Sequence, residues 1–227
     1  FAFVHTPIPI PKALKNDEAR KALEAEWKKL EDKGAWLKHK VRPKAEVQAE
    51  AKSKGKKCHF GSLMDFCFLK NSQLRKELQS YKGRVVFRGD QVTDEEGLWA
   101  CFSQEGSGSS HMAAVKVLDA IANMPGCTGV NADAKSAYTQ VLLSSIDSHI
   151  ETWISLPPHR RPDSWKGIEN PICPLVVNLY GHPLAGLWWE KHCESTLFKI
   201  GFERMKGHEC LSVSYTHLRA HETRGNL

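Results

Sequence analysis

The stretch that decides the fold reads Lys82-Gly83-Arg84-Val85-Val86-Phe87-Arg88-Gly89. A short run of β-branched and aromatic residues that ends at a glycine is typical of a strand, so we predict a strand at residues 84–89. Successive side chains of a strand point to opposite faces, and we therefore expect Lys82, Arg84 and Arg88 to share one face. Such a basic face would suit a triphosphate, although exposed edge strands bear charged residues at least as often.

Upstream of this strand, the sequence predicts a helix over residues 17–30. Asn16 can cap its N-terminus and Gly34 ends it. Apolar residues recur inside it at steps of three and four, which makes one apolar stripe: Ala19, Leu23, Trp27 and Leu30. The prolines at residues 7–11 predict an extended arm before the helix. An apolar, aromatic-rich segment at residues 60–69 precedes the strand.

Downstream, helical and strand patterns alternate. A Ser- and Gly-rich loop at residues 103–110 leads to a helix that begins near Ser110 and ends at residues 125–126. Strands are predicted at residues 129–133, 149–156 and 172–179, and a last helix begins near Pro183 and ends at Gly201. This mixture of strands and helices predicts an α+β fold.

Composition limits the class of protein. The chain has 227 residues, of which 41% are hydrophobic and 26% charged, as in ordinary globular proteins. No apolar run approaches the roughly 20 residues that a membrane span needs, so we expect no integral membrane protein and no membrane partner. The first six residues do not form a secretory leader, and the lack of an initiator Met predicts a fragment. Seven cysteines without a C-x-x-C pair favour a reducing compartment over a disulfide framework or a zinc site.

Positive charge is concentrated in the first third of the chain. Residues 1–80 contain 18 Lys and Arg against 10 Asp and Glu, and residues 38–57 contain eight against two. Such a stretch can bind a polyanion by releasing its counterions. The alternative is a solvated, flexible linker, and the charge pattern taken alone favours this alternative over polyanion binding.

Several common chemistries lack their motifs. The sequence has no G-x-x-x-x-G-K-[ST] phosphate loop and no G-x-S-x-G elbow. His217 and His221 have zinc-site spacing but lack the Glu of H-E-x-x-H. The remaining candidate is Asp133, at the end of a predicted strand, where a carboxylate could bind a hard cation such as Mg²⁺. An Asp in such a position is more often a cap or turn residue.

Five segments line up in order with one family: 11–36, 82–89, 133–138, 179–189 and 198–202. The first combines a Glu- and Ala-rich helix with Gly34-Ala35-Trp36, and the second resembles K-A-R-L-V-A-R-G. The third, Asp133-Ala134-Lys135-Ser136-Ala137-Tyr138, is similar to D-V-K-T-A-F. The fourth, from Leu179-Tyr180-Gly181, resembles L-Y-G-L-K-Q-A-P-R-A-W, and the fifth matches L-x-x-x-G-F. The chain resembles the reverse transcriptase region of copia-type LTR retrotransposons.

This resemblance implies an architecture. We expect fingers plus a partial polymerase palm, the palm being a ferredoxin-like split βαβ sheet backed by helices. Residues 1–92 would form the N-terminal arm, helix and fingers, and residues 93–213 the partial palm. Residues 214–227 resemble translated sequencing-adapter read-through and are expected to be a disordered tail. The localisation implied is intracellular, in a cytoplasmic particle or the nucleus.

The resemblance also implies residue roles. Asp133 would be the first catalytic carboxylate and would bind Mg²⁺ or Mn²⁺, with the Ala134 backbone carbonyl as a second ligand. Two such metals drive nucleotidyl transfer to a primer 3′-hydroxyl. Tyr138 would exclude ribonucleotides, although a core aromatic is the alternative. The remaining nucleotide-binding candidates are Lys82, Arg84, Arg88, Ala137 and Gly181. The partners would be an RNA or DNA template with its primer, deoxynucleoside triphosphates and, in the polyprotein, the protease, integrase and RNase H regions.

Three departures from the family pattern bear on activity. His182-Pro183-Leu184 stands where the family has L-K-Q, and residues 45–66 are hard to align. The Y-V-D-D motif with the other two catalytic carboxylates is absent, since the only later aspartates, Asp147 and Asp163, precede Tyr180. We therefore expect this chain by itself to be inactive. The alternative is a decayed remnant that only binds nucleic acid through its basic N-terminal half.

Overall fold

The computed structural model describes residues 5–102, 112–146, 150–207 and 210–214. The chain divides into two compact units. Unit 1 comprises Phe1–Phe102 and Leu142–Pro183, and unit 2 comprises Ser103–Val141 and Leu184–Leu227. Strands and helices occur together, so the predicted α+β class is confirmed. The expected domain boundaries after residues 92 and 213 stay predictions.

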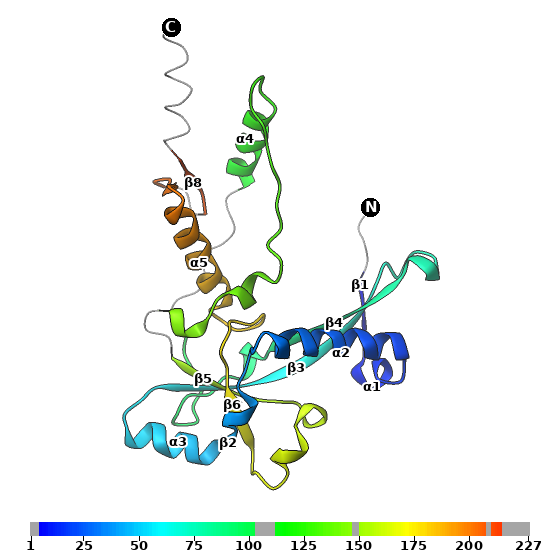
Figure 1. The fold of residues 1–227 in the computed structure, drawn as a ribbon, viewed down its shortest axis with the longest axis vertical. Coiled ribbons are helices and arrows are strands. Elements are labelled where there is room, and N and C mark those ends of the chain that lie inside the picture. Colours follow the sequence, from blue (N-terminus) through cyan, green and yellow to red (C-terminus); the bar gives the residue numbers. More distant parts are fainter. Residues whose placement is uncertain (1–4, 103–111, 147–149, 208–209, 215–227) are drawn as a thin grey trace. The chain divides into compact units, whose positions relative to one another are not determined.

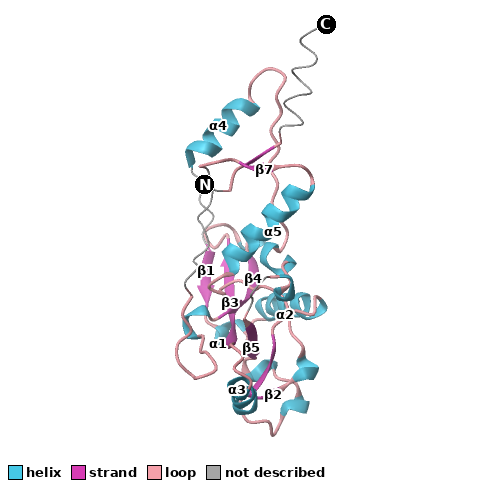
Figure 2. Ribbon diagram, turned by 90° about the vertical axis from the view of Figure 1, so that its left-hand side faces the viewer, coloured by secondary structure: helices cyan, strands magenta, loops and turns pink. Residues whose placement is uncertain are grey.

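Unit 1 is organised around one long strand, β3 (Cys58–Lys70), in a six-stranded mixed sheet (Figures 1 and 2). The first part of β3 pairs in parallel with β5 (Glu151–Ser155). Its second part pairs antiparallel with β4 (Ser80–Phe87) and, at its end, with β1 (His5–Ile8). Antiparallel pairing continues from β5 to β6 (Pro171–Pro174) and from β6 to β2 (Arg42–Pro43).

Helix α2 (Asp17–Asp32) confirms the predicted helix. The Asn16 side chain accepts a hydrogen bond from the Ala19 N–H at 2.9 Å, and the predicted apolar stripe is buried. The stripe packs on β4, where a Cβ at Gly83 would lie 2.6 Å from the Ala22 carbonyl oxygen. The odd-numbered positions of β4 therefore face α2. Before α2, residues 5–13 form β1 and the short helix α1 (Ile10–Ala13), so the extended arm was only partly right.

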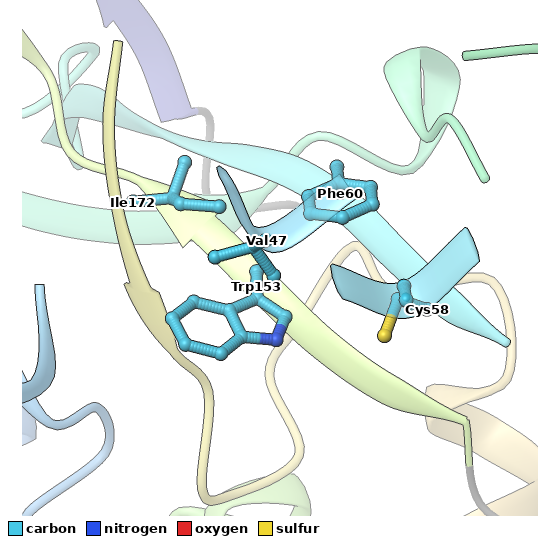
Figure 3. Packing of buried hydrophobic residues seen from close by; sticks show 6 residues of the cluster. Val47, Cys58, Phe60, Trp153 and Ile172 are labelled. Carbon is cyan, nitrogen blue, oxygen red and sulfur yellow. The ribbon is translucent and has the colours of Figure 1, made fainter. Parts of the chain in front are cut away.

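The basic stretch at residues 38–57 is folded, so its interpretation as a flexible linker was wrong. It contains β2 and helix α3 (Lys44–Ser53), whose Val47 and Ala51 are buried. Figure 3 shows Val47 packed among residues of β3, β5 and β6 in one apolar cluster, completed by Cys58, Phe60, Trp153 and Ile172. Lys52 of α3 is exposed, whereas the Lys44 ammonium lies 5.3 Å from the centre of the Phe60 ring. A high charge density therefore did not prevent one side of α3 from being buried.

Unit 2 contains helices α4 (Met112–Ala122) and α5 (Ala185–Lys199) and the two-residue strands β7 (Glu203–Arg204) and β8 (Ser212–Val213). The predicted strand at residues 129–133 was wrong: these residues have no regular structure, and Val130 is 87% exposed. A strand needs a neighbour for its backbone hydrogen bonds, and no described segment pairs with this one.

In unit 1, β5 and β6 are shorter than the predicted strands at residues 149–156 and 172–179. Two other expectations, the loop at residues 103–110 and the tail from residue 215 onward, lie outside the described residues. No helix among the described residues is long and apolar enough to cross a membrane.

Candidate nucleic-acid interface

One face of the β3–β4 hairpin carries both basic and aromatic side chains. Residues paired across two strands project to the same face, and Phe66 pairs with Arg84 while Phe68 pairs with Lys82. Lys70 follows at the next position of β3 on this face. Because α2 packs on the odd positions of β4, these even positions lie on the opposite side of the hairpin. We call this set, together with Tyr180, the basic–aromatic face.

Within the part of the chain that the structure describes, the cations of the basic–aromatic face form no ion pairs. Among the described residues, no carboxylate lies within 4.0 Å of Lys70, Lys82 or Arg84. Burial, and then the positive charges of Arg84 and Lys70, lower the pKa of Lys82. Like charges held together in this way favour the binding of an anion, because its negative charge would relieve their repulsion.

The aromatic rings on this face are placed for stacking. Phe66 and Phe68 stack on each other, with ring centroids 6.1 Å apart and planes 28° apart, and Phe66 remains 38% exposed. The Arg84 guanidinium lies 5.6 Å from the centre of the Tyr180 ring. Exposed rings interleaved with cations are the elements with which proteins bind single-stranded nucleic acid, the rings taking bases and the cations taking phosphates.

The Tyr180–Gly181 turn is fixed directly against β4. The Phe87 N–H donates to the Tyr180 carbonyl oxygen at 2.8 Å. Gly181 has φ of +89°, and a Cβ there would collide with the Phe87 carbonyl oxygen, so only glycine fits this approach. The structure thus brings two sequence segments, 82–89 and 179–181, side by side, and puts Arg84, Tyr180 and Gly181 together.

His182, which follows this glycine, belongs to the core. Its side chain is 4% exposed, and its ring lies 4.9 Å from that of Phe87 and 5.8 Å from that of Phe102. Burial lowers the pKa of His182 to about 3. His182 is therefore neutral at physiological pH and contributes packing to the turn.

Arg88 departs from the expectation that it shares a face with Lys82 and Arg84. Strand β4 ends at Phe87, and Arg88 begins the turn into a short 3-10 helix (Gly89–Gln91). Its guanidinium pairs with Asp90 at 3.0 Å and lines a cavity beside Ser62 and Asp65. The prediction assumed that the alternation of a strand continues through Arg88, but β4 ends one residue before it. Arg88 therefore does not share the face of Lys82 and Arg84.

Asp133 and Ala134 are exposed, in the irregular segment of unit 2. Among the described residues, no three His, Cys, Asp or Glu side chains are grouped as metal ligands. Mg²⁺ is bound by several oxygen ligands in near-octahedral geometry, and one exposed carboxylate does not meet that need. The donor set described in this chain therefore does not fit a Mg²⁺ or Mn²⁺ site by itself.

Tyr138 and Ala137 lie in a 3-10 helix (Ala137–Gln140) that follows Ser136, a residue with φ of +53°. The Thr139 hydroxyl donates to the Ser136 carbonyl at 2.9 Å and stabilises this turn. Tyr138 lines a cavity of about 440 Å³ together with Trp189, Cys193 and Leu197 of α5. This position beside a cavity is compatible both with a gating ring and with a packed aromatic.

Sequence reasoning missed Phe66, Phe68 and Lys70 as candidate site residues. Their only signal was the aromatic-rich segment at residues 60–69, and which of its side chains face Lys82 and Arg84 depends on the pairing register. Comparison of the chain with protein-family models, curated proteins and solved structures gives no match.

Proposed function

We propose that this chain is the fingers and part of the palm of a reverse transcriptase similar to those of copia-type elements. Its own contribution is to hold single-stranded template on the basic–aromatic face. The observation that carries the proposal is the pairing of Phe66 with Arg84 and Phe68 with Lys82 on one face, with no carboxylate within 4.0 Å of either cation among the described residues. The contact between segments 82–89 and 179–181 supports it, since the family resemblance rests on both.

The surroundings of Asp133 favour a second candidate function, a remnant that binds nucleic acid without copying it. This exposed carboxylate is not grouped with two further ligands among the described residues. Binding by the basic–aromatic face does not require Asp133. The two candidates therefore share the template-binding surface and differ in catalysis.

The shared surface is tested with a fluorescein-labelled 12-nucleotide RNA by fluorescence anisotropy at low salt. The double variant Lys82→Ala/Arg84→Ala is expected to bind this RNA at least tenfold more weakly than the parent, because two phosphate contacts are lost. The matched control is Lys21→Ala/Lys28→Ala, which removes two exposed charges from α2, on the other side of the hairpin. Equal losses in both double variants would reduce the effect to net charge and contradict the proposal.

Polymerase activity needs a separate experiment, on a polyprotein that carries the Y-V-D-D motif in frame. Asp133→Asn is expected to abolish primer extension there, because it removes a metal-binding charge and keeps the side-chain shape. RNA binding should remain at the parent level. Undiminished extension by the variant would exclude Asp133 as a catalytic ligand.

A further inference from the structure

Unit 1 contains a cavity of about 420 Å³ where the partners of β3 change. β5 pairs with β3 as far as Ser62, and β1 pairs with it from Cys67 onward. The residues between these two pairings, Leu63 to Asp65, line the cavity together with the segment that follows β5. The cavity thus lies between the sheet and the segment that follows β5, and its volume is typical of small-ligand sites.

Three basic side chains line this cavity, namely Arg88, His159 and Arg161. The Arg161 Nε–H donates to the Leu156 carbonyl oxygen at 3.0 Å, which anchors the guanidinium at the wall of the cavity. Among the described residues, Arg161 has no carboxylate within 4.0 Å, whereas Arg88 pairs with Asp90. Arg161 therefore has donors left for an oxyanion, and guanidinium groups bind phosphate in a bidentate manner.

The one carboxylate of the cavity wall, Asp65, is already engaged. Its side chain is 2% exposed, and Oδ1 accepts from the Trp27 indole N–H at 2.6 Å. Its Oδ2 lies 2.7 Å from His159 Nε2. Asp65 thus holds the His159 ring in one orientation. The His159 side chain stays 40% exposed, and because Nε2 donates to Asp65, Nδ1 can donate to an anion in the imidazolium form of the ring.

The rest of the wall is apolar, and it limits the chemistry of the ligand. The hydroxyls of Ser62 and Ser155 are the other polar side-chain groups of the wall, and its apolar residues are Ile10, Leu63, Met64, Leu156, Pro157 and Pro158. A free inorganic ion would leave these apolar surfaces in contact with water. A ligand with an anionic head and a small planar or apolar body would satisfy both parts of the wall.

We propose that this cavity binds a phosphate monoester with a small planar or apolar body, its phosphate held by Arg161 and His159. The proposal is independent of template binding, because the cavity is lined by none of the residues of the basic–aromatic face. Such a phosphate monoester is present both in a free mononucleotide and at the phosphorylated end of a nucleic acid strand. Binding is non-covalent, and no bond is made or broken.

The test is calorimetric titration of the full 227-residue chain with phenyl phosphate, inorganic phosphate and phenol. Phenyl phosphate should bind saturably and more tightly than inorganic phosphate, and phenol should not bind. Arg161→Ala should weaken phenyl phosphate at least tenfold, and His159→Gln should weaken it less. Arg75→Ala, which removes an exposed charge elsewhere in unit 1, should change its affinity less than twofold. Comparing uridine monophosphate with a 5′-phosphorylated dinucleotide then distinguishes the two sources of phosphate.

Further outcomes separate this proposal from the proposed function. Lys82→Ala/Arg84→Ala should leave phenyl phosphate binding intact while it weakens RNA binding, and Arg161→Ala should do the reverse. If Arg161→Ala lowers the melting temperature strongly, Arg161→Lys keeps the charge and should bind with intermediate affinity. Absent binding, equal binding of phenol, or loss of phenyl phosphate binding in Lys82→Ala/Arg84→Ala would overturn the proposal.

Discussion

Acidification below about pH 6.5 should destabilise this fold through the buried His182. Burial lowers the pKa of His182 to about 3, while an unfolded chain has the ordinary His value of about 6.5. As the pH falls below 6.5, the unfolded state takes up a proton that the folded state does not bind. The stabilisation is therefore complete above pH 6.5 and is lost progressively between pH 6.5 and 3.

The magnitude follows from the difference between the two pKa values. Each pH unit well inside this window costs about 1.4 kcal/mol, and because the unfolded histidine is already half protonated at pH 6.5, the loss from pH 6.5 to pH 4.5 is about 2.3 kcal/mol. That is a large part of the roughly 5–15 kcal/mol that stabilises a typical domain. Burial also lowers the pKa of His59, which adds to the loss in the same direction. The pKa of Glu50, about 2, places its contribution below pH 4.5.

Urea denaturation followed by circular dichroism at pH 7.5, 6.5, 5.5 and 4.5 measures this loss. His182→Phe keeps a ring against Phe87 and Phe102 and removes the titration, so it should flatten most of the pH dependence. The exposed His39 provides the matched control, and His39→Gln should leave the parent slope unchanged. A parent whose unfolding free energy is constant from pH 6.5 to 4.5, or an unaltered slope in His182→Phe, would refute the reasoning.

Three substitutions test other contacts of the fold and of the candidate site. Phe66→Ala should weaken binding of single-stranded RNA by roughly 5- to 150-fold, the range for losing one base–aromatic stack, and unchanged anisotropy titrations would contradict the stacking role. Gly181→Ala should lower the unfolding free energy by more than about 2 kcal/mol in urea, because φ is +89° and the new methyl group meets the Phe87 carbonyl. Asp65→Asn should cost about 1–3 kcal/mol, since a buried amide cannot accept at both oxygen positions, and a neutral effect would show that the contacts of Trp27 and His159 with it contribute little.

The parts of the fold that sequence predicted were those with strong local signals. Helix α2 has its cap residue, its apolar spacing and its glycine stop in one continuous stretch, and the structure follows all three. Helix α3 has lysines and glutamates at four of its ten positions and buries only two side chains, so its amphipathic pattern was too weak to outweigh the charge. Residues 129–133 have the composition of a strand, but no described segment pairs with them. Pairing depends on the tertiary fold, so composition alone could not predict its absence.

In the candidate site, too, local sequence patterns predicted some residues, whereas contacts between distant segments added others. Alternation along β4 was enough to place Lys82 and Arg84 on one face, but not to find the end of the strand before Arg88. Phe66 and Phe68 join that face only through the register of β3 with β4, which no local pattern in either strand reports. Tyr180 approaches Arg84 across about a hundred residues of sequence, and no local pattern reports such a contact.

Template binding on the basic–aromatic face is tested most directly by the salt dependence of RNA binding, compared between the parent and Lys82→Ala/Arg84→Ala. The logarithm of the association constant of the 12-nucleotide RNA is plotted against the logarithm of salt concentration from 50 to 200 mM. Each phosphate contact on a single strand contributes about 0.7 to the steepness of this line, so the double variant should be less steep by roughly 1.4. Parallel lines for parent and variant would contradict template binding on the basic–aromatic face.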